Sequence, residues 1–169
     1  MFDFDVRSGH DLGEQEMLAN LSRVPALREE LSEPIARIAR RPSVVVAPAT
    51  ALQDALQLMT KQQVSAALVA SHGVLLGTLT EREILRRLLA DPPVTAASPV
   101  WKVMVSESET LLENDTIAYA VQKLWTLGVR TMPVMHANGN LAGLLDTHDI
   151  VAWLCDRLSA RGVSRIGHG

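Results

Sequence analysis

The chain has 169 residues, which suits one compact domain or two small halves that share a core. Hydrophobic residues make up 47% and charged residues 21%, so most of the chain is expected to fold, and an aromatic content of only 4% predicts an aliphatic core. The net charge of −3 argues against a nucleic-acid partner, and the absence of an apolar run of about 18 residues argues against a membrane span.

Residues 1–33 are predicted to form an N-terminal arm that is partly helical. The segment at 13–34 carries apolar residues on one face, and Pro25 is expected to split it into two short helices. The arm is expected to cover apolar surface of the rest of the chain, although a contact with a partner or a second copy is the alternative.

Residues 34–90 form the first of two similar units. The predicted elements are, in order, a strand at 43–47, a helix at 50–63, strands at 66–70 and 74–79, and a helix at 81–90. Thr50 is a suitable N-cap for the first of these helices. Residues 91–99 are rich in proline and alanine and are predicted to be a linker.

Residues 100–158 repeat the same order, and residues 159–169 are expected to be a flexible tail. The second unit has a strand at 109–112, a helix at 114–128, strands at 131–135 and 141–145, and a helix at 147–158. Asp115 is the expected cap of its first helix and Gly128 the expected stop.

The two units align along their whole length. A shift of 65 residues places IARIA at 35–39 on VWKVM at 100–104, and one extra residue near Asn138 raises the shift to 66. GTLTEREIL at 77–85 then falls on GLLDTHDIV at 143–151. A three-stranded unit with its helices on one face leaves the other face bare, so the units are expected to pack sheet to sheet or helix to helix.

The element order and the words VSAALV, GVRTMPVM, GTLTERE and GLLDTHD resemble a tandem pair of CBS (cystathionine β-synthase) domains. The resemblance covers about residues 34–158 and is looser in the first repeat, where Leu68 stands at the usual proline. It implies an α/β (α+β) fold of two CBS repeats related by pseudo-twofold symmetry. It also implies an adenosyl ligand such as AMP, ADP, ATP or S-adenosylmethionine in the cleft between the repeats, with no required cofactor.

By this resemblance, each pocket pairs the strand-to-helix turn of one repeat with the middle strand of the other, and residues near Val45 and Thr110 add walls. The first pocket combines Thr80, Arg82 and Glu83 with Val129, Arg130 and Thr131. The second pocket combines Asp146, His148 and Asp149 with Val64, Ser65 and Ala66. A carboxylate in such a turn can accept hydrogen bonds from two ribose hydroxyls, and a helix N-terminus favours anions.

The two turns depart from the family pattern in different ways. Asp149 keeps the ribose carboxylate, but Asp146 replaces the threonine or serine that lies near phosphate, so the second pocket is expected to prefer a nucleoside or a cationic adenosyl ligand, or to be empty. In the first pocket Thr80 is kept, and Arg82 and Arg130 could neutralise phosphate.

Several of these residues have a purely structural interpretation as well. Glu83 replaces the family aspartate, and its longer side chain could carry the carboxylate past the ribose; it also has capping-box spacing from Thr80. Thr80 and Asp146 stand where an N-cap is wanted, and Asp149 could be a surface charge at a helix start. Arg130 and His148 could equally be solvated side chains.

Other motifs give little sign of chemistry. The five histidines lack metal-ligand spacing, so no metal site is expected, and no catalytic nucleophile or phosphate-loop motif occurs, so the chain is not expected to be an enzyme. Cys155 is the single cysteine and is expected to be a small packing residue. Trp125 is expected in the core, whereas Trp101 and Trp153 could lie on an apolar face used in dimerisation. The polar, acidic start is unlike a signal peptide, so a cytoplasmic location is expected.

The predicted function is a non-catalytic regulatory module that senses an adenosyl ligand. The resemblance implies a homodimer, in the form of a disc of four repeats, and signalling to a protein partner by a change in the orientation of repeats or protomers. A ligand-free CBS pair that serves as a dimerisation or interaction scaffold is the alternative.

Overall fold

The computed structural model describes residues 25–38, 40, 43–106 and 108–160. The chain divides into two compact units. The sheet unit takes residues 40–112 and 131–145, and the helical unit takes residues 1–39, 113–130 and 146–169. The first predicted helix of the arm and the tail from residue 161 lie outside the described residues.

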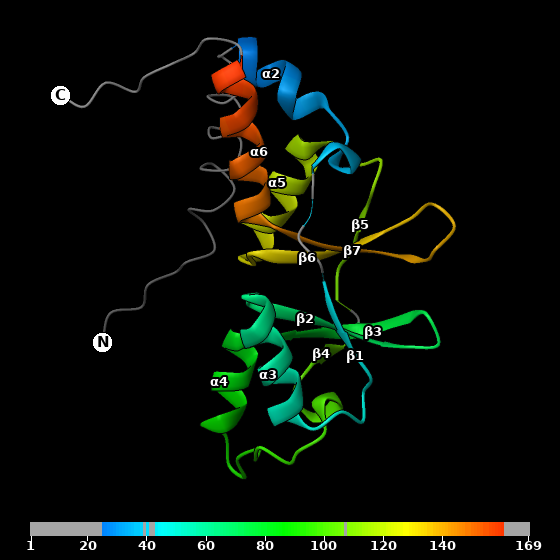
Figure 1. Ribbon diagram of the computed structural model, residues 1–169, viewed down its shortest axis with the longest axis vertical. Helices are drawn as coiled ribbons and strands as arrows, with labels where there is room; N and C mark the ends of the chain where they lie inside the picture. Colours follow the sequence, from blue (N-terminus) through cyan, green and yellow to red (C-terminus); the bar gives the residue numbers. More distant parts are fainter. Residues whose placement is uncertain (1–24, 39, 41–42, 107, 161–169) are drawn as a thin grey trace, which may run out of the picture. The chain divides into compact units, whose positions relative to one another are not determined.

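The sheet unit contains residues 40–90 of repeat 1, the linker and the strands of repeat 2 up to Leu145 (Figure 1). Its four-stranded sheet has the order β1-β2-β3-β4, in which β2 pairs parallel to β1 and antiparallel to β3, and β4 is antiparallel to β3. Its three-stranded sheet has the order β5-β6-β7, with β5 parallel to β6. The strands are β1 (Val44–Val46), β2 (Ala66–Ser71), β3 (Val74–Thr80), β4 (Val105–Ser106), β5 (Leu111–Leu112), β6 (Thr131–Met135) and β7 (Leu141–Asp146).

Strand β2 is buried on both faces because its alternate residues enter two different cores. Ala67 and Val69 belong to a core that also takes residues of helices α3 (Leu52–Gln62) and α4 (Glu81–Leu88), which lie on one side of the sheet (Figure 1). Ala66 and Leu68, on the other face, pack with Leu144 of β7. The strands of the two repeats therefore meet sheet to sheet, one of the two packings expected from the sequence.

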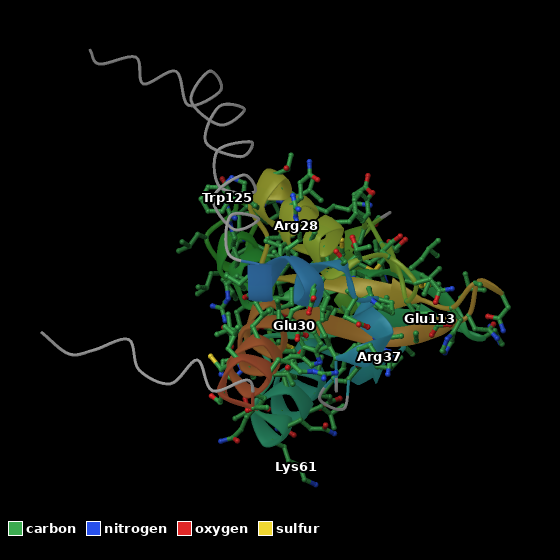
Figure 2. The ribbon with its side chains drawn as sticks, turned by 90° about the horizontal axis from the view of Figure 1, so that it is seen from above. Arg28, Glu30, Arg37, Lys61, Glu113 and Trp125 are labelled. Carbon is green, nitrogen blue, oxygen red and sulfur yellow. The ribbon has the colours of Figure 1, made fainter. Side chains whose placement is uncertain are left out.

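The helical unit contains α2 (Pro25–Ser32), the 3-10 helix η1 (Ile35–Arg37), α5 (Ile117–Leu127) and α6 (Thr147–Ala160). Helix α2 packs against both α5 and α6, as expected for an arm that covers apolar surface, and its Leu31 is buried. Glu30, labelled on α2 in Figure 2, is only 2% exposed and faces the guanidinium of Arg157 on α6, with 3.8 Å between Oε2 and Nε.

The segments that lead into the two repeats make equivalent hydrogen bonds. In the sheet unit, the lead-in of repeat 2 runs beside the start of α3, where Leu52 N–H donates to Ser98 O and Val100 N–H donates to Thr50 O, both at 2.9 Å. In the helical unit, the lead-in of repeat 1 runs beside the start of α5, with the bonds Ile117 N–H to Glu33 O and Ile35 N–H to Asp115 O at the same distance. Every member of the second pair lies 65 residues from its counterpart in the first, so the repeat seen in the sequence extends to the hydrogen bonds.

The N-cap residues predicted for α3 and α5, the first helices of the two repeats, are both wrong. Helix α3 is preceded by Ala51, which makes no side-chain capping bond, and not by Thr50. The carbonyl groups of the linker satisfy the first amides of α3 instead, which removes the need for a capping side chain. Helix α5 is capped one residue later than predicted, by Thr116 rather than Asp115; its hydroxyl accepts from Tyr119 N–H at 3.2 Å.

Two predictions of buried side chains are also wrong. Trp125 is 48% exposed because it follows the buried Leu124 by one residue, which turns it about 100° around α5. Cys155 is exposed because it lies one helical turn from Val151, which is also exposed. Among the described helices, none is both long enough and apolar enough to cross a membrane.

Candidate functional site

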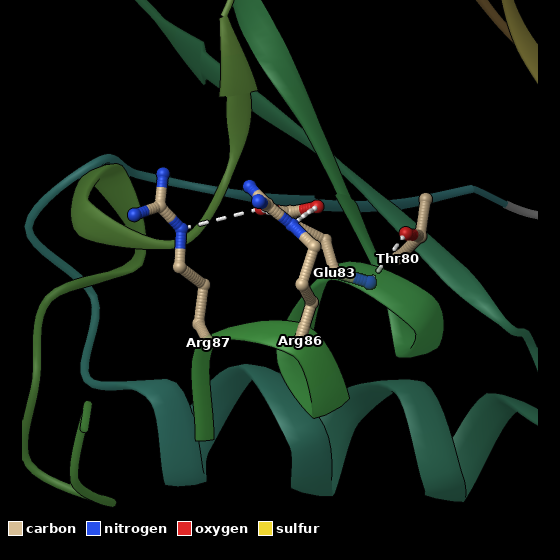
Figure 3. Close-up of polar contacts among 4 residues, drawn as sticks. All are labelled: Thr80, Glu83, Arg86 and Arg87. Carbon is tan, nitrogen blue, oxygen red and sulfur yellow. Dashed lines mark hydrogen bonds and ion pairs between the residues drawn. The ribbon is translucent and has the colours of Figure 1, made fainter. Parts of the chain in front are cut away.

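The repeat-1 turn joins β3 to α4 at Thr80. The Thr80 hydroxyl accepts a hydrogen bond from Glu83 N–H at 3.2 Å, so Thr80 is the N-cap that the sequence predicts (Figure 3). The next amide, of Glu81, donates to the carbonyl of Ser65 at 3.2 Å, just before β2 begins. The turn is therefore fixed both to its own helix and to the start of the middle strand of the same repeat.

The Glu83 carboxylate binds two arginines further along α4 (Figure 3). Its Oε1 accepts from Arg86 Nη2 at 2.6 Å, from Arg86 Nε at 3.1 Å and from Arg87 Nε at 3.2 Å, and its Oε2 accepts from Arg86 Nε at 3.0 Å. The hydrogen bonds from Arg86, followed by the charges of both arginines, hold the pKa of Glu83 below its usual range even though partial burial opposes that shift. Only 12% of the Glu83 side chain is exposed, whereas the side chains of Arg86 and Arg87 are 66% and 42% exposed, so the ion pairs lie at the surface.

The repeat-2 turn joins β7 to α6 at Asp146 and is built differently. Asp146 Oδ1 accepts from His148 N–H at 2.7 Å, and Asp146 N–H donates to Asp149 Oδ2 at 3.1 Å. These two bonds form a reciprocal cap, with aspartate in both positions of the capping box. The backbone amide of Thr147 donates to the carbonyl of Arg130 at 2.9 Å, the counterpart of the bond between Glu81 and Ser65.

The capping interpretation of Asp146 is confirmed, and the interpretation of Asp149 as a surface charge is wrong. Asp146 is 8% exposed and Asp149 is 7% exposed. Both carboxylates lie within the first turn of α6, where free backbone amides stabilise negative charge. Two buried carboxylates this close repel an added anion, so the turn is better suited to hydroxyl or cationic groups than to phosphate.

The remaining predicted site residues lie where the sequence places them in each repeat. Val64 and Val129 each follow a residue that ends the preceding helix in the left-handed backbone conformation. These residues are Gln63 (φ 53°) after α3 and Gly128 (φ 62°) after α5. The exposed side chains are those of Arg82, Val129, Arg130 and His148; those of Val64, Ser65 and Thr131 are half-buried, and Ala66 is buried. The pairing of each turn with the middle strand of the other repeat stays a prediction.

A cavity of about 360 Å³ lies elsewhere in the sheet unit, between the turn that joins β2 to β3 and the turn that joins β6 to β7. Of the residues expected to contact the ligand or to form the walls of its pocket, only Thr110 lines this cavity. The cavity is lined by residues 72–77, Ser108, Thr110, Met135 and 138–140. In the described part of the chain, no group of three or more histidine, cysteine, aspartate or glutamate residues could hold a metal ion.

The sequence profile of the CBS domain family matches this chain twice, at residues 35–90 and 100–156. The chain belongs to the CBS domain family. It is 30% identical over 124 residues to the CBS domain-containing protein YhcV of Bacillus subtilis, and the match covers 73% of this chain and 87% of that protein. The two matched segments correspond to the repeats found in the sequence, so each turn described above belongs to one CBS repeat.

Solved CBS proteins share the fold. The CBS domain protein PAE2072 from Pyrobaculum aerophilum, complexed with AMP, superposes with a TM-score of 0.63 at 22% identity, covering 73% of this chain and 98% of that one. CBSX2, also in complex with AMP, gives a TM-score of 0.62 at 21% identity, covering 73% and 97% of the two chains. These similarities establish the CBS-pair fold for this protein.

Proposed function

We propose that this CBS pair is a non-catalytic regulatory module that binds an adenosyl ligand, namely AMP, ADP, ATP or S-adenosylmethionine. The observation that supports the proposal most strongly is that two CBS proteins of the same fold are complexes with AMP. The order of elements and both strand-to-helix turns of the family are present in this chain.

The residues predicted from the sequence are proposed as the ligand contacts, except Glu83, whose carboxylate is bound by Arg86 and Arg87. At the repeat-2 turn, Asp149 would accept hydrogen bonds from the ribose hydroxyls, with His148 beside it in the same turn. The buried charge of Asp146 and Asp149 favours a nucleoside or a cationic adenosyl ligand there. At the repeat-1 turn, the Thr80 hydroxyl and the exposed Arg82 are suited to phosphate.

We further propose that the protein acts as a homodimer and signals through a change in the orientation of its repeats or protomers. The closing helices carry exposed apolar side chains at equivalent positions: Leu85 is 63% and Leu89 87% exposed at α4, and Val151, 66 residues after Leu85, is 57% exposed on α6. Such side chains are typical of a surface that is covered in an assembly. The ligand can shift the equilibrium between arrangements only by as much as its affinities for them differ.

The proposal is tested by mass spectrometry of the purified protein and by calorimetric titration with AMP, ADP, ATP and S-adenosylmethionine. We expect an adenosyl compound to co-purify, or at least one of the four to bind more tightly than about 1 mM, the equivalent of about −4 kcal/mol. Weaker binding of all four, with nothing co-purified, would reject the sensor and leave a dimeric scaffold. The exposed apolar residues of the closing helices favour that scaffold as the second candidate.

A further inference from the structure

The two turns of the CBS pair occupy equivalent positions, yet their carboxylates are held differently. Glu83 and Asp149 are related by the 66-residue shift of the repeat. Glu83 binds arginine side chains, whereas the bond described for Asp149 comes from the backbone amide of Asp146 within its own turn. The difference bears on which turn can hold a ribose.

Much of the hydrogen-bonding capacity of Glu83, above all that of Oε1, is already used by the arginines. Three N–H groups of the arginines make four contacts with the carboxylate, three with Oε1 and one, shared by Arg86 Nε, with Oε2. Two vicinal hydroxyls need an acceptor each. They would have to displace contacts in which donor and acceptor are both charged, which are about twice as strong as neutral hydrogen bonds.

The arginines also direct the Glu83 carboxylate along α4. Arg86 and Arg87 follow Glu83 by three and four residues, so they lie one helical turn further from the Thr80 cap, and both guanidinium groups are on the side of the carboxylate (Figure 3). The equivalent positions on α6 are Ala152 and Trp153, neither of which carries a charge. The arginine clamp is therefore specific to repeat 1.

We propose that Arg86 and Arg87 withdraw Glu83 from ligand binding, so that each chain holds the ribose of one nucleotide, at the turn that carries Asp149. The inference rests on the proposed function and adds which of the two turns binds the ribose. Arg86 and Arg87 are positioning residues, because they act through Glu83. Repeat 1 then contributes Thr80 and Arg82 to the module without a ribose contact of its own.

The test is calorimetric titration of the full chain with AMP, for the wild type and for Glu83→Gln and Asp149→Asn. The two substitutions are matched, since each removes one charge at an equivalent position and keeps a side-chain amide oxygen that can accept a hydrogen bond. We expect one AMP per wild-type chain, an affinity within about twofold for Glu83→Gln, and an affinity at least about tenfold weaker for Asp149→Asn. Two AMP per chain, or a tenfold loss in Glu83→Gln, would overturn the inference while leaving the proposed function intact.

A second measurement on the wild-type chain does not depend on the folding of any variant. With side-chain carboxyl carbons labelled for NMR, saturation with AMP is expected to move the signal of Asp149 and to leave that of Glu83 in place. A shift of the Glu83 signal comparable with that of Asp149 would overturn the inference. If the wild type binds none of the four adenosyl compounds, the proposed function is wrong and this inference fails with it.

Discussion

The carbonyl of Glu33 accepts a hydrogen bond from the amide of Ile117 at 2.9 Å, so the segment before repeat 1 caps the first helix of repeat 2. In the equivalent bond, the amide of Leu52 donates to the carbonyl of Ser98, so the segment before repeat 2 caps the first helix of repeat 1. Because each repeat supplies backbone acceptors that the other needs, neither repeat satisfies its helix ends alone. The CBS pair, rather than the single repeat, is the folding unit that these bonds imply.

Gly77, which opens the repeated motif, is needed for the close approach of β4 to β3. A Cβ atom added at Gly77 would collide with the backbone carbonyl of Val105. We expect Gly77→Ala to lower the free energy of unfolding by about 2–3 kcal/mol, measured by urea denaturation. Gly73→Ala is the control: its φ of +80° costs about 1–2 kcal/mol, but the added methyl meets open space. A smaller loss for Gly77→Ala than for Gly73→Ala would show that β4 does not lie against β3 as described.

Arg157 stabilises the packing of the N-terminal arm on α6. Its guanidinium faces Glu30, whose side chain is only 3% exposed, and lies 5.1 Å from the ring centre of Trp153. We expect Arg157→Ala to cost about 2 kcal/mol or more, because it removes a cation that faces a buried carboxylate. Arg37→Ala is the matched control, because Arg37 pairs with Glu33 at a site where the two side chains are 63% and 41% exposed; its cost is expected to stay below about 1 kcal/mol. Equal costs in thermal or urea unfolding would contradict the role assigned to Arg157.

The ion pairs of Glu83 predict a pH dependence of stability. The pKa of Glu83 in the folded protein lies below its usual range, mainly because of the hydrogen bonds from Arg86. The folded state therefore binds this proton less readily than the unfolded state, and the contribution of Glu83 is fully present above about pH 4.3 and is lost as the pH falls through the folded-state value. The stability advantage of the wild type over Glu83→Gln should shrink between about pH 7 and about pH 3. A difference that is constant over this range would show that Glu83 is not held by the arginines in solution.

The proposed homodimer is tested at exposed leucines of α4 and its C-cap. We expect the wild type to sediment as two chains, and the double variant Leu85→Glu with Leu89→Glu to sediment as one, because two charges would be placed in an apolar interface. Leu58→Glu is the control, since Leu58 is 41% exposed on α3 rather than on a closing helix. A wild type that sediments as a single chain, or a double variant that stays a dimer, would contradict the assignment.

Apart from the two-residue strand β4 and the 3-10 helices, the order of elements could be predicted because the same pattern occurs in both repeats. The agreement reaches individual residues such as the Thr80 cap and the Gly128 stop. The cap of α3 could not be predicted, because its acceptors are backbone carbonyls of a linker more than forty residues away, including Ser98, and carry no side-chain signal.

The structure of the two strand-to-helix turns could be predicted only in part from the sequence. The spacing of Thr80 and Glu83 predicted a cap, but the direction of the Glu83 side chain depends on competition between the turn and the arginines that follow it. The exposure of Cys155 depends on which face of α6 meets other helices, and helical periodicity alone does not determine that.

The most direct test of the central claim is a crystal structure of the full chain grown with AMP. The account predicts AMP bound with its ribose hydroxyls within hydrogen-bonding distance of the Asp149 carboxylate, and the Glu83 carboxylate still paired with Arg86. A structure at saturating AMP without nucleotide at the Asp149 turn, or with the ribose held by Glu83, would contradict it.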